Sequence, residues 1–182
     1  MVKVAKRVAA VLLLSTALAG CGYTTKSLLP ADIKRIHVAP VKNAIDLSTE
    51  NSGKDHFRVY RPGLEVELTN AIINRFIFDG NLRVSSHPDD SDAIVEARLT
   101  NYRRDALRYT EGDDIEEYRV NVVLDVSVYR RSNHEVIWHD PALAGDTTFF
   151  VAGQHAATED DAAARAVEDA ARRVVEKTLE LW

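Results

Sequence analysis

Two stretches in the middle of the chain alternate apolar and polar residues, which is the pattern of strands buried on one face. The first begins at Ala93 and runs towards Tyr109, and the second begins at Tyr118. Their apolar positions are Ala93, Val95, Ala97 and Leu99, and then Tyr118, Val120, Val122, Leu124, Val126 and Val128. A turn signal, Glu111–Asp114, separates them. The pattern predicts a long antiparallel hairpin.

Shorter extended segments flank this hairpin. Ile33–Val41 is rich in β-branched residues and predicts a first strand. Leu82–Val84 and Glu135–Trp138 predict two short strands, and a further extended piece is expected around Asp146–Val151. The polar segment Asn43–Tyr60 is predicted to be a loop.

Two segments repeat apolar residues every three or four positions, as amphipathic helices do. The first starts at Pro62 and stops at Gly80, because glycine adopts the left-handed conformation that ends many helices. The second follows Thr158 and Asp161, a pair that resembles a capping box. The stripes are Leu64, Leu68, Ala71, Ile72 and Phe76 in the first helix, and Ala163, Ala166, Val167, Ala170, Val174, Thr178 and Leu181 in the second.

The predicted order is therefore strand, helix, four strands and helix, without internal repeats. Consecutive strands framed by two helices predict an α+β fold. We expect a small, mostly antiparallel sheet of four to five strands with two helices packed on one face. The other face is semi-polar and would meet solvent or a partner.

The start of the chain is organised as a secretory signal peptide, with basic residues, an apolar run and small residues before a cleavage point. Leu18–Cys21 forms a bacterial lipoprotein box, in which cleavage before Cys21 leaves a thiol that carries diacylglycerol. Cys21 is the single cysteine, so an ordinary signal with a chance cysteine is the weaker alternative. We expect residues 1–20 to be the signal peptide, 21–32 a lipidated N-terminal lead and 33–182 one domain.

The location of the mature protein follows from this lipid. No segment after the signal approaches the roughly 20 apolar residues of a membrane span. Acyl chains on Cys21, palmitate among them, would hold the protein on the membrane. Gly22 stands where an Asp would act as an inner-membrane retention signal. These features favour the outer membrane, with the domain facing the periplasm.

Charge and chemistry narrow the function. Loss of three basic residues with the signal changes the formal net charge from −5 to −8, which disfavours nucleic-acid binding. His134 and His139 lack a third ligand at metal spacing, and the acidic clusters Asp89–Asp92 and Asp113–Glu117 lack the full calcium-loop pattern. No nucleophile motif or phosphate loop is present. We therefore expect no enzyme, no catalytic or metal residues, and no cofactor besides the covalent lipid.

Several segments, in this order, resemble the LptE family of lipopolysaccharide-assembly lipoproteins. They are Cys21–Tyr23, Ser27–Pro30, Ile33–Asn43, Gly63–Arg75, Asp79–Val84, Asp92–Val95 and Tyr118–Val123. The resemblance covers nearly all of the mature chain and implies two helices against a small sheet. It also implies a partner, the outer-membrane β-barrel LptD, whose lumen the lipoprotein plugs while lipopolysaccharide passes to the cell surface.

The resemblance also implies where lipopolysaccharide is contacted, because the family's basic contact residues lie in loops at one end of the domain. The hairpin segment Ala106–Tyr118 matches one such loop in position. The resemblance therefore implies Arg108 as the residue that contacts lipopolysaccharide there. The loop Val151–Ala157, before the last helix, would hold a second contact. It offers only His155 and no Lys or Arg.

A phosphorylated sugar-lipid needs cations, and arginine suits phosphate best. The candidates are Arg103, Arg104, Arg108, Arg130 and Arg131. The alternative is that these arginines are solvated strand ends that protect sheet edges. Four tyrosines on the central strands, Tyr102, Tyr109, Tyr118 and Tyr129, are candidates to face a partner, since tyrosine combines contact area with a hydrogen-bonding end. Alternatively, half of them simply cover the sheet.

A second class of function stays open at this point. Lipoproteins that activate a cell-wall synthase, or that assemble a secretion pore, share a start such as Ile33–Asn43. A cell-wall activator usually needs a long Pro-rich or disordered reach after the cysteine. Only about eight residues separate Cys21 from Pro30, which favours the barrel plug.

Overall fold

The structure is a computed structural model that describes residues 30, 32–45, 56–58 and 61–180. The predicted signal peptide, the lipidation site Cys21 and all but two residues of the predicted lead lie outside the described residues. So do Leu181 and Trp182.

Within the described residues, seven strands form one mixed sheet, and the predicted α+β fold is confirmed. Five strands follow the order β4-β1-β5-β6-β7, which agrees with the predicted number. They are β1 (Arg35–Val38), β4 (Arg83–Val84), β5 (Ala93–Tyr109), β6 (Ile115–Arg130) and β7 (Val136–Phe150). The short strands β2 (Lys42–Asn43) and β3 (His56–Arg58) add to this number by pairing with β5.

The sheet is mixed because a helical crossover separates β1 from β4. The chain passes from β1 through α2 (Leu64–Asp79) to β4, and such a crossover places the two strands parallel. β1 and β2 also pair parallel to β5, whereas β3, β6 and β7 join antiparallel. A short 3-10 helix, Pro88–Asp90, connects β4 to β5.

The long hairpin predicted from the alternation is present as β5 and β6. β7 differs from prediction, because one 15-residue strand replaces two separate pieces. Pairing with β6 keeps the segment between them extended, and a register shift after Leu124 accommodates it. Pro141 fits there because β7 is an edge strand of the described sheet, where a missing N–H breaks no ladder.

Both helices end or begin where the sequence signals lie. Gly80 caps α2 with φ 76°, as expected, while the helix starts at Leu64 after a left-handed Gly63 rather than at Pro62. The second helix, α3 (Glu159–Glu180), follows the predicted capping box. The Asp161 amide donates to Thr158 Oγ1 at 3.1 Å, and the Thr158 amide donates to Asp161 Oδ2 at 3.4 Å.

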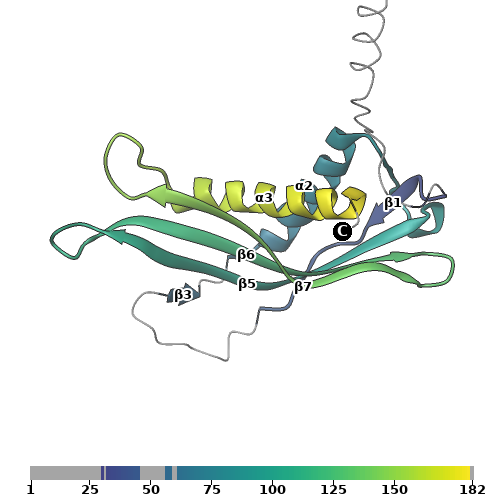
Figure 1. Cartoon of the computed structure of the whole chain (residues 1–182), viewed down its shortest axis with the longest axis horizontal. Helices are drawn as coiled ribbons and strands as arrows, with labels where there is room; N and C mark the ends of the chain where they lie inside the picture. Colours follow the sequence, from purple (N-terminus) through teal and green to yellow (C-terminus); the bar gives the residue numbers. More distant parts are fainter. Residues whose placement is uncertain (1–29, 31, 46–55, 59–60, 181–182) are drawn as a thin grey trace, which may run out of the picture.

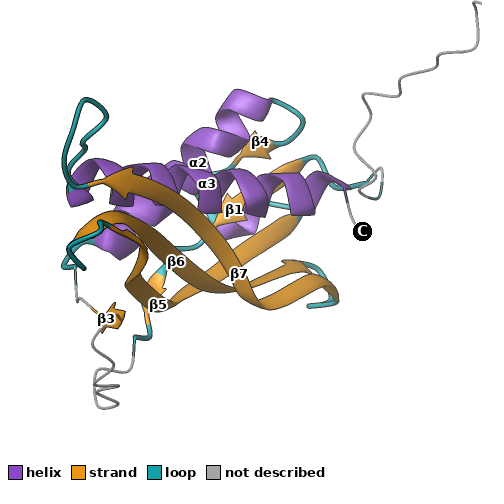
Figure 2. Ribbon diagram, turned by 60° about the vertical axis from the view of Figure 1, so that its left-hand side comes forward, coloured by secondary structure: helices purple, strands orange, loops and turns teal. Residues whose placement is uncertain are grey.

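The helices cover one face of the sheet, and the core lies between the two layers (Figure 1). α3 runs along the sheet and α2 crosses behind it, as the turned view also shows (Figure 2). The small residues Ala163, Ala166 and Ala170 face the sheet and are fully buried. They let α3 approach β7 so closely that Gly145 has no space for a side chain.

The long strands make the domain elongated. β6 has 16 residues, which at about 3.3 Å per residue span about 50 Å. Among the described elements, no helix covers the second face of the sheet, which is called the open face below (Figure 1). The open face carries the odd-numbered residues of β6, since the even-numbered Val120 to Val128 are buried beneath the helices.

Candidate functional site

The β5–β6 hairpin projects beyond the helical cover and forms one end of the molecule (Figure 1). This hairpin end consists of residues 106–117 with Phe150 of β7 and the following Val151. Its turn is closed by the Thr110 amide donating to the Asp114 carbonyl at 2.8 Å and the Asp113 amide donating to the Thr110 carbonyl at 3.1 Å. Asp113 has φ 62°, a conformation that Asp tolerates better than most residues.

Four of the five candidate arginines form an ion pair, and Arg108 has the most accessible side chain of these four. Its side chain is 58% exposed, and its nearest acid, Glu117, is 3.7 Å away on the opposite strand. The guanidinium lies 5.6 Å from the centroid of the Phe150 ring. This partial pairing leaves Arg108 able to bind a further anion.

Three further apolar side chains are exposed at the same end of the molecule. Leu107, Tyr109 and Val151 are 42%, 44% and 43% exposed. Val151 lies beside the hairpin because its amide donates to the Glu116 carbonyl at 3.1 Å. Exposed apolar groups next to an arginine suit an amphiphilic anion, since the arginine pairs with its charge and the apolar groups cover its hydrocarbon part.

The tip of the hairpin is acidic. Glu111, Asp113 and Asp114 are all exposed in the turn. Their charges oppose the approach of a phosphate along the hairpin axis. An anion would therefore reach Arg108 more easily from the side of the hairpin than along its axis.

Arg104 belongs to a different environment, on the helix-covered side at the start of α3. It forms an ion pair with Glu159, and its guanidinium lies 4.6 Å from the centroid of the Tyr118 ring. Its side chain is only 23% exposed. Arg104 therefore fastens α3 to the sheet, which leaves Arg108 as the better candidate for a ligand contact.

Tyr102 is buried beside Arg104, with 1% exposure, and donates its hydroxyl to Glu159 at 3.2 Å. Burial and then the neighbouring Glu159 carboxylate raise the pKa of Tyr102 to about 12. The structure thus places Tyr102 under the helices and away from any surface that a partner could reach. The predicted partner-facing role is corrected at this position, because the register turns Tyr102 to the same face as Val122.

The other tyrosines lie in three different settings. Tyr109 is exposed at the hairpin end. Tyr118 is half-buried on the helix side and stacks on Phe149 with 5.7 Å between ring centroids. Tyr129, at the far end, donates its hydroxyl to Glu96 at 2.9 Å, and burial followed by this bond raises its pKa. The four tyrosines therefore do not form one surface.

Arg103 lies on the open face and is engaged in a short polar row. Its Nε is 3.0 Å from Asp105 Oδ2, and Asp105 accepts a 2.9 Å hydrogen bond from Asn121. Arg119, which the sequence analysis did not single out, adds a cation to this face and lies 3.9 Å from Asp146. The alternation along β6 could have predicted this position, because Arg119 and Asn121 are two residues apart and therefore point to the same face.

Arg130 and Arg131 lie at the opposite end of the sheet from Arg108. Arg130 pairs with Asp32 and lies 3.7 Å from Glu135, and Arg131 donates to the Ser91 carbonyl at 2.7 Å. Thirteen residues of β6 separate this end from the partner of Arg108, which corresponds to about 40 Å. The five candidate arginines therefore cannot bind one headgroup together.

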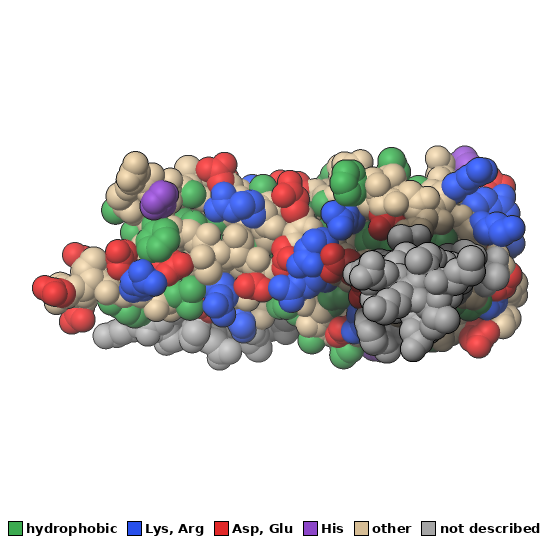
Figure 3. Space-filling view, turned by 45° about the horizontal axis from the view of Figure 1, so that its top comes forward, with side chains coloured by type: hydrophobic (Ala, Val, Ile, Leu, Met, Phe, Trp, Pro, Cys, Tyr) green, Lys and Arg blue, Asp and Glu red, His purple; other side chains and the backbone are tan. Residues whose placement is uncertain are grey.

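Over the helical side, Lys and Arg alternate with Asp and Glu (Figure 3). On α3, Arg173 pairs with Asp169 at 2.8 Å and with Asp146 of β7 at 3.1 Å, and Arg172 pairs with Glu176 at 2.6 Å. The cations on this side are neutralised by neighbouring acids. Over α3 the visible cations are therefore interspersed with acids, and a separate group of Lys and Arg side chains lies at the right-hand end of the view (Figure 3).

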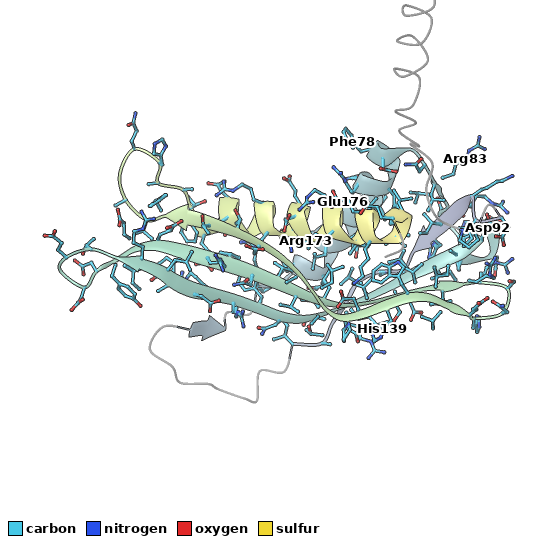
Figure 4. The ribbon with its side chains drawn as sticks, in the orientation of Figure 1. Phe78, Arg83, Asp92, His139, Arg173 and Glu176 are labelled. Carbon is cyan, nitrogen blue, oxygen red and sulfur yellow. The ribbon has the colours of Figure 1, made fainter. Side chains whose placement is uncertain are left out.

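The open face also carries a histidine–carboxylate pair. His139 lies on β7 at 2.8 Å from Asp125 of β6, on the side of the sheet away from the helices (Figure 4). Arg98 of β5 is the cross-strand neighbour of Asp125. Within the described residues, no group of three or more His, Cys, Asp and Glu side chains could hold a metal ion. In the same part of the chain, no helix has the length and apolar character to cross a membrane.

Two further features were missed by the sequence analysis. Arg61, before α2, pairs with Asp160 of α3 at 2.7 Å and ties the two helices together. Only the fold brings these residues close, so no local pattern revealed the pair. Ile77 and Phe78 at the end of α2 are 62% and 81% exposed, and they could have been noticed as apolar residues off the buried stripe.

Comparisons with known proteins place this geometry in context. A sequence model of the LptE family, described as lipopolysaccharide-assembly, matches residues 33–178. No curated protein matches the chain. Among solved structures, the chain is similar to the hypothetical protein CT253 from Chlamydia trachomatis, with 13% identity, coverage of 81% of this chain and 98% of that chain, and a TM-score of 0.48. It is also similar to the rare lipoprotein B from Shewanella oneidensis, with 11% identity, coverage of 80% and 91%, and a TM-score of 0.45.

Proposed function

We propose, from the premise that this chain belongs to the LptE family of lipopolysaccharide-assembly proteins, that it binds and plugs an LptD-like β-barrel. In this proposal the protein is anchored in the outer membrane by lipid on Cys21 and faces the periplasm. It assists the transport of lipopolysaccharide and its insertion into the outer leaflet. Its contribution is binding and positioning, without bond chemistry.

The observation that carries the proposal is the long open face with its paired polar groups. Arg103 with Asp105, and His139 with Asp125, form polar pairs on the face of these strands that no described helix covers. The interior of an outer-membrane barrel is polar, so a surface with matched charges can be enclosed there without repulsion. An elongated sheet of about 50 Å also suits a lumen that runs along one axis.

Arg108 is the proposed contact with lipopolysaccharide. It is exposed, only loosely paired with Glu117 and flanked by apolar groups at the hairpin end. The Arg108 guanidinium can donate two parallel hydrogen bonds to a phosphate. That contact would be stronger than its present one with the Glu117 carboxylate, which lies 3.7 Å away. His155, in the exposed loop before α3, supplies at most a minor second contact.

The test is recovery of the tagged, full-length protein from detergent-solubilised outer membrane, with mass spectrometry of the proteins that co-purify. A large β-barrel in near-equal amount is expected. Recovery of a cell-wall synthase, or of no barrel, would overturn the proposal and favour a regulatory lipoprotein.

A matched pair of variants shows which face meets the barrel. Arg98→Glu reverses an exposed charge on the open face, and Arg165→Glu does the same on the outer side of α3. Barrel recovery should fall for Arg98→Glu and stay unchanged for Arg165→Glu. The opposite result would assign the contact to the helices.

A further inference from the structure

The C-terminal end of α2 exposes two consecutive apolar side chains. Phe78 is 81% exposed, the highest value among the exposed large apolar side chains of the described residues, and Ile77 is 62% exposed. The buried stripe of α2 ends with Phe76, so neither residue contributes to the core. The Arg75 guanidinium lies 5.4 Å from the centroid of the Phe78 ring and leaves most of that ring accessible.

This end of α2 is also where the described chain begins. After Gly80 the chain enters β4, whose Arg83 amide donates to the Lys34 carbonyl at 3.0 Å. One turn earlier, the Ile33 amide donates to the Pro30 carbonyl at 3.0 Å. Phe78 and Arg83 lie at the same end of the molecule, opposite the hairpin end (Figure 4).

We propose that Ile77 and Phe78 insert into the headgroup region of the bilayer that holds the lipid on Cys21. The inference rests on the proposed lipidation and on no other part of the proposed function. Nine residue steps separate Cys21 from Pro30, so the domain can lie no further than about 30 Å from its anchor. A tether of this length keeps the bilayer at a high effective concentration, so that a weak apolar contact is sufficient.

The contact depends on apolar burial more than on charge. Lys34 and Arg83 are exposed at this end, but so are Asp89 and Asp90 of the short 3-10 helix. Charges of both signs give no net attraction to an anionic surface. An aromatic and a branched aliphatic side chain at a helix end match the apolar face of an interfacial helix.

The test uses spin labels on the lipidated, full-length protein in vesicles of phosphatidylethanolamine and phosphatidylglycerol. Ile77→Cys provides the probe and keeps Phe78. Val66→Cys is the matched control, because Val66 is 58% exposed at the other end of the same helix. The unmutated protein should take no label, since the lipid occupies the only thiol; labelling of it would show that the anchor itself is absent.

Accessibility to oxygen and to a water-soluble nickel chelate distinguishes lipid from water around each label. The ratio of oxygen to nickel accessibility should be several-fold higher at position 77 than at position 66, and Phe78→Ser should lower it at position 77. An aqueous ratio at position 77, or an equal ratio at both positions, would overturn the proposal. If position 77 were protected from both agents only after a barrel is added, the surface would belong to a protein partner. That result would also overturn the proposal of bilayer insertion. None of these outcomes depends on barrel recovery, so the two proposals fail separately.

Discussion

Replacing Gly145 with alanine should push α3 away from β7. An added Cβ would lie 2.5 Å from the Ala166 carbonyl oxygen and 2.6 Å from the Ala170 Cα, distances that packed carbon atoms do not reach. Both contacts are with the backbone of α3, so no side-chain rotation can relieve them. Overpacking in cores usually costs 1–3 kcal/mol, and a clash with a helix backbone belongs at the upper end, about 3 kcal/mol.

Urea unfolding of the purified protein measures this loss. With an m-value of about 2 kcal/mol per molar urea, a loss of about 3 kcal/mol lowers the midpoint by about 1.5 M. Gly112→Ala is the control, because its Cβ would meet only Thr110 Oγ1 at 3.7 Å, an ordinary contact. Its free energy of unfolding should change by less than about 0.5 kcal/mol.

A second substitution tests the cause. Ala170→Gly removes a methyl group but leaves the backbone atoms that clash, so it should not restore the stability of Gly145→Ala. A midpoint shift for Gly145→Ala no larger than that of Gly112→Ala would refute the close approach of α3. Rescue by Ala170→Gly would refute the assignment of the clash to the backbone.

Three further outcomes are expected. Arg108→Glu should weaken lipopolysaccharide binding about tenfold or more in a direct binding assay, while Arg165→Glu leaves it unchanged; equal effects would reduce Arg108 to general surface charge. Asp140→Asn should lower the free energy of unfolding at pH 7, because the variant loses the charged partner of the Lys177 ammonium. The hydrogen bond from Lys177 lowers the pKa of Asp140 from 3.8, so its stabilisation is lost as the carboxylate takes up its proton. The difference between variant and wild type should therefore vanish as the pH falls below about 4. Tyr102→Phe should cost about 2 kcal/mol, and it should remove a tyrosine ionisation near pH 12 from an ultraviolet titration. Because the raised pKa of Tyr102 stabilises the fold below pH 10 and is lost as the pH rises through about 12, the variant should approach the wild type in stability at that pH.

Local patterns in the chain determined most of the elements. Alternation defined β5 and β6, the three- and four-residue spacing defined both helices, and Gly80 and Thr158 marked a helix end and a helix start. These signals are local, because a strand or a helix that buries one face repeats its apolar residues with a fixed period. The same patterns were sufficient for the α+β class.

Only the tertiary structure decided which side chains lie together. The five candidate arginines look equivalent in the sequence, yet Arg104 is held against Glu159, Arg130 lies about 40 Å from the hairpin end, and Arg108 remains accessible. Tyr102 became a core residue because the register shift between Leu99 and Asn101 of β5 set the face to which its side chain points. Pairing partners, sheet register and the reach of α3 over the sheet depend on contacts between residues far apart in the chain, and no local period records them.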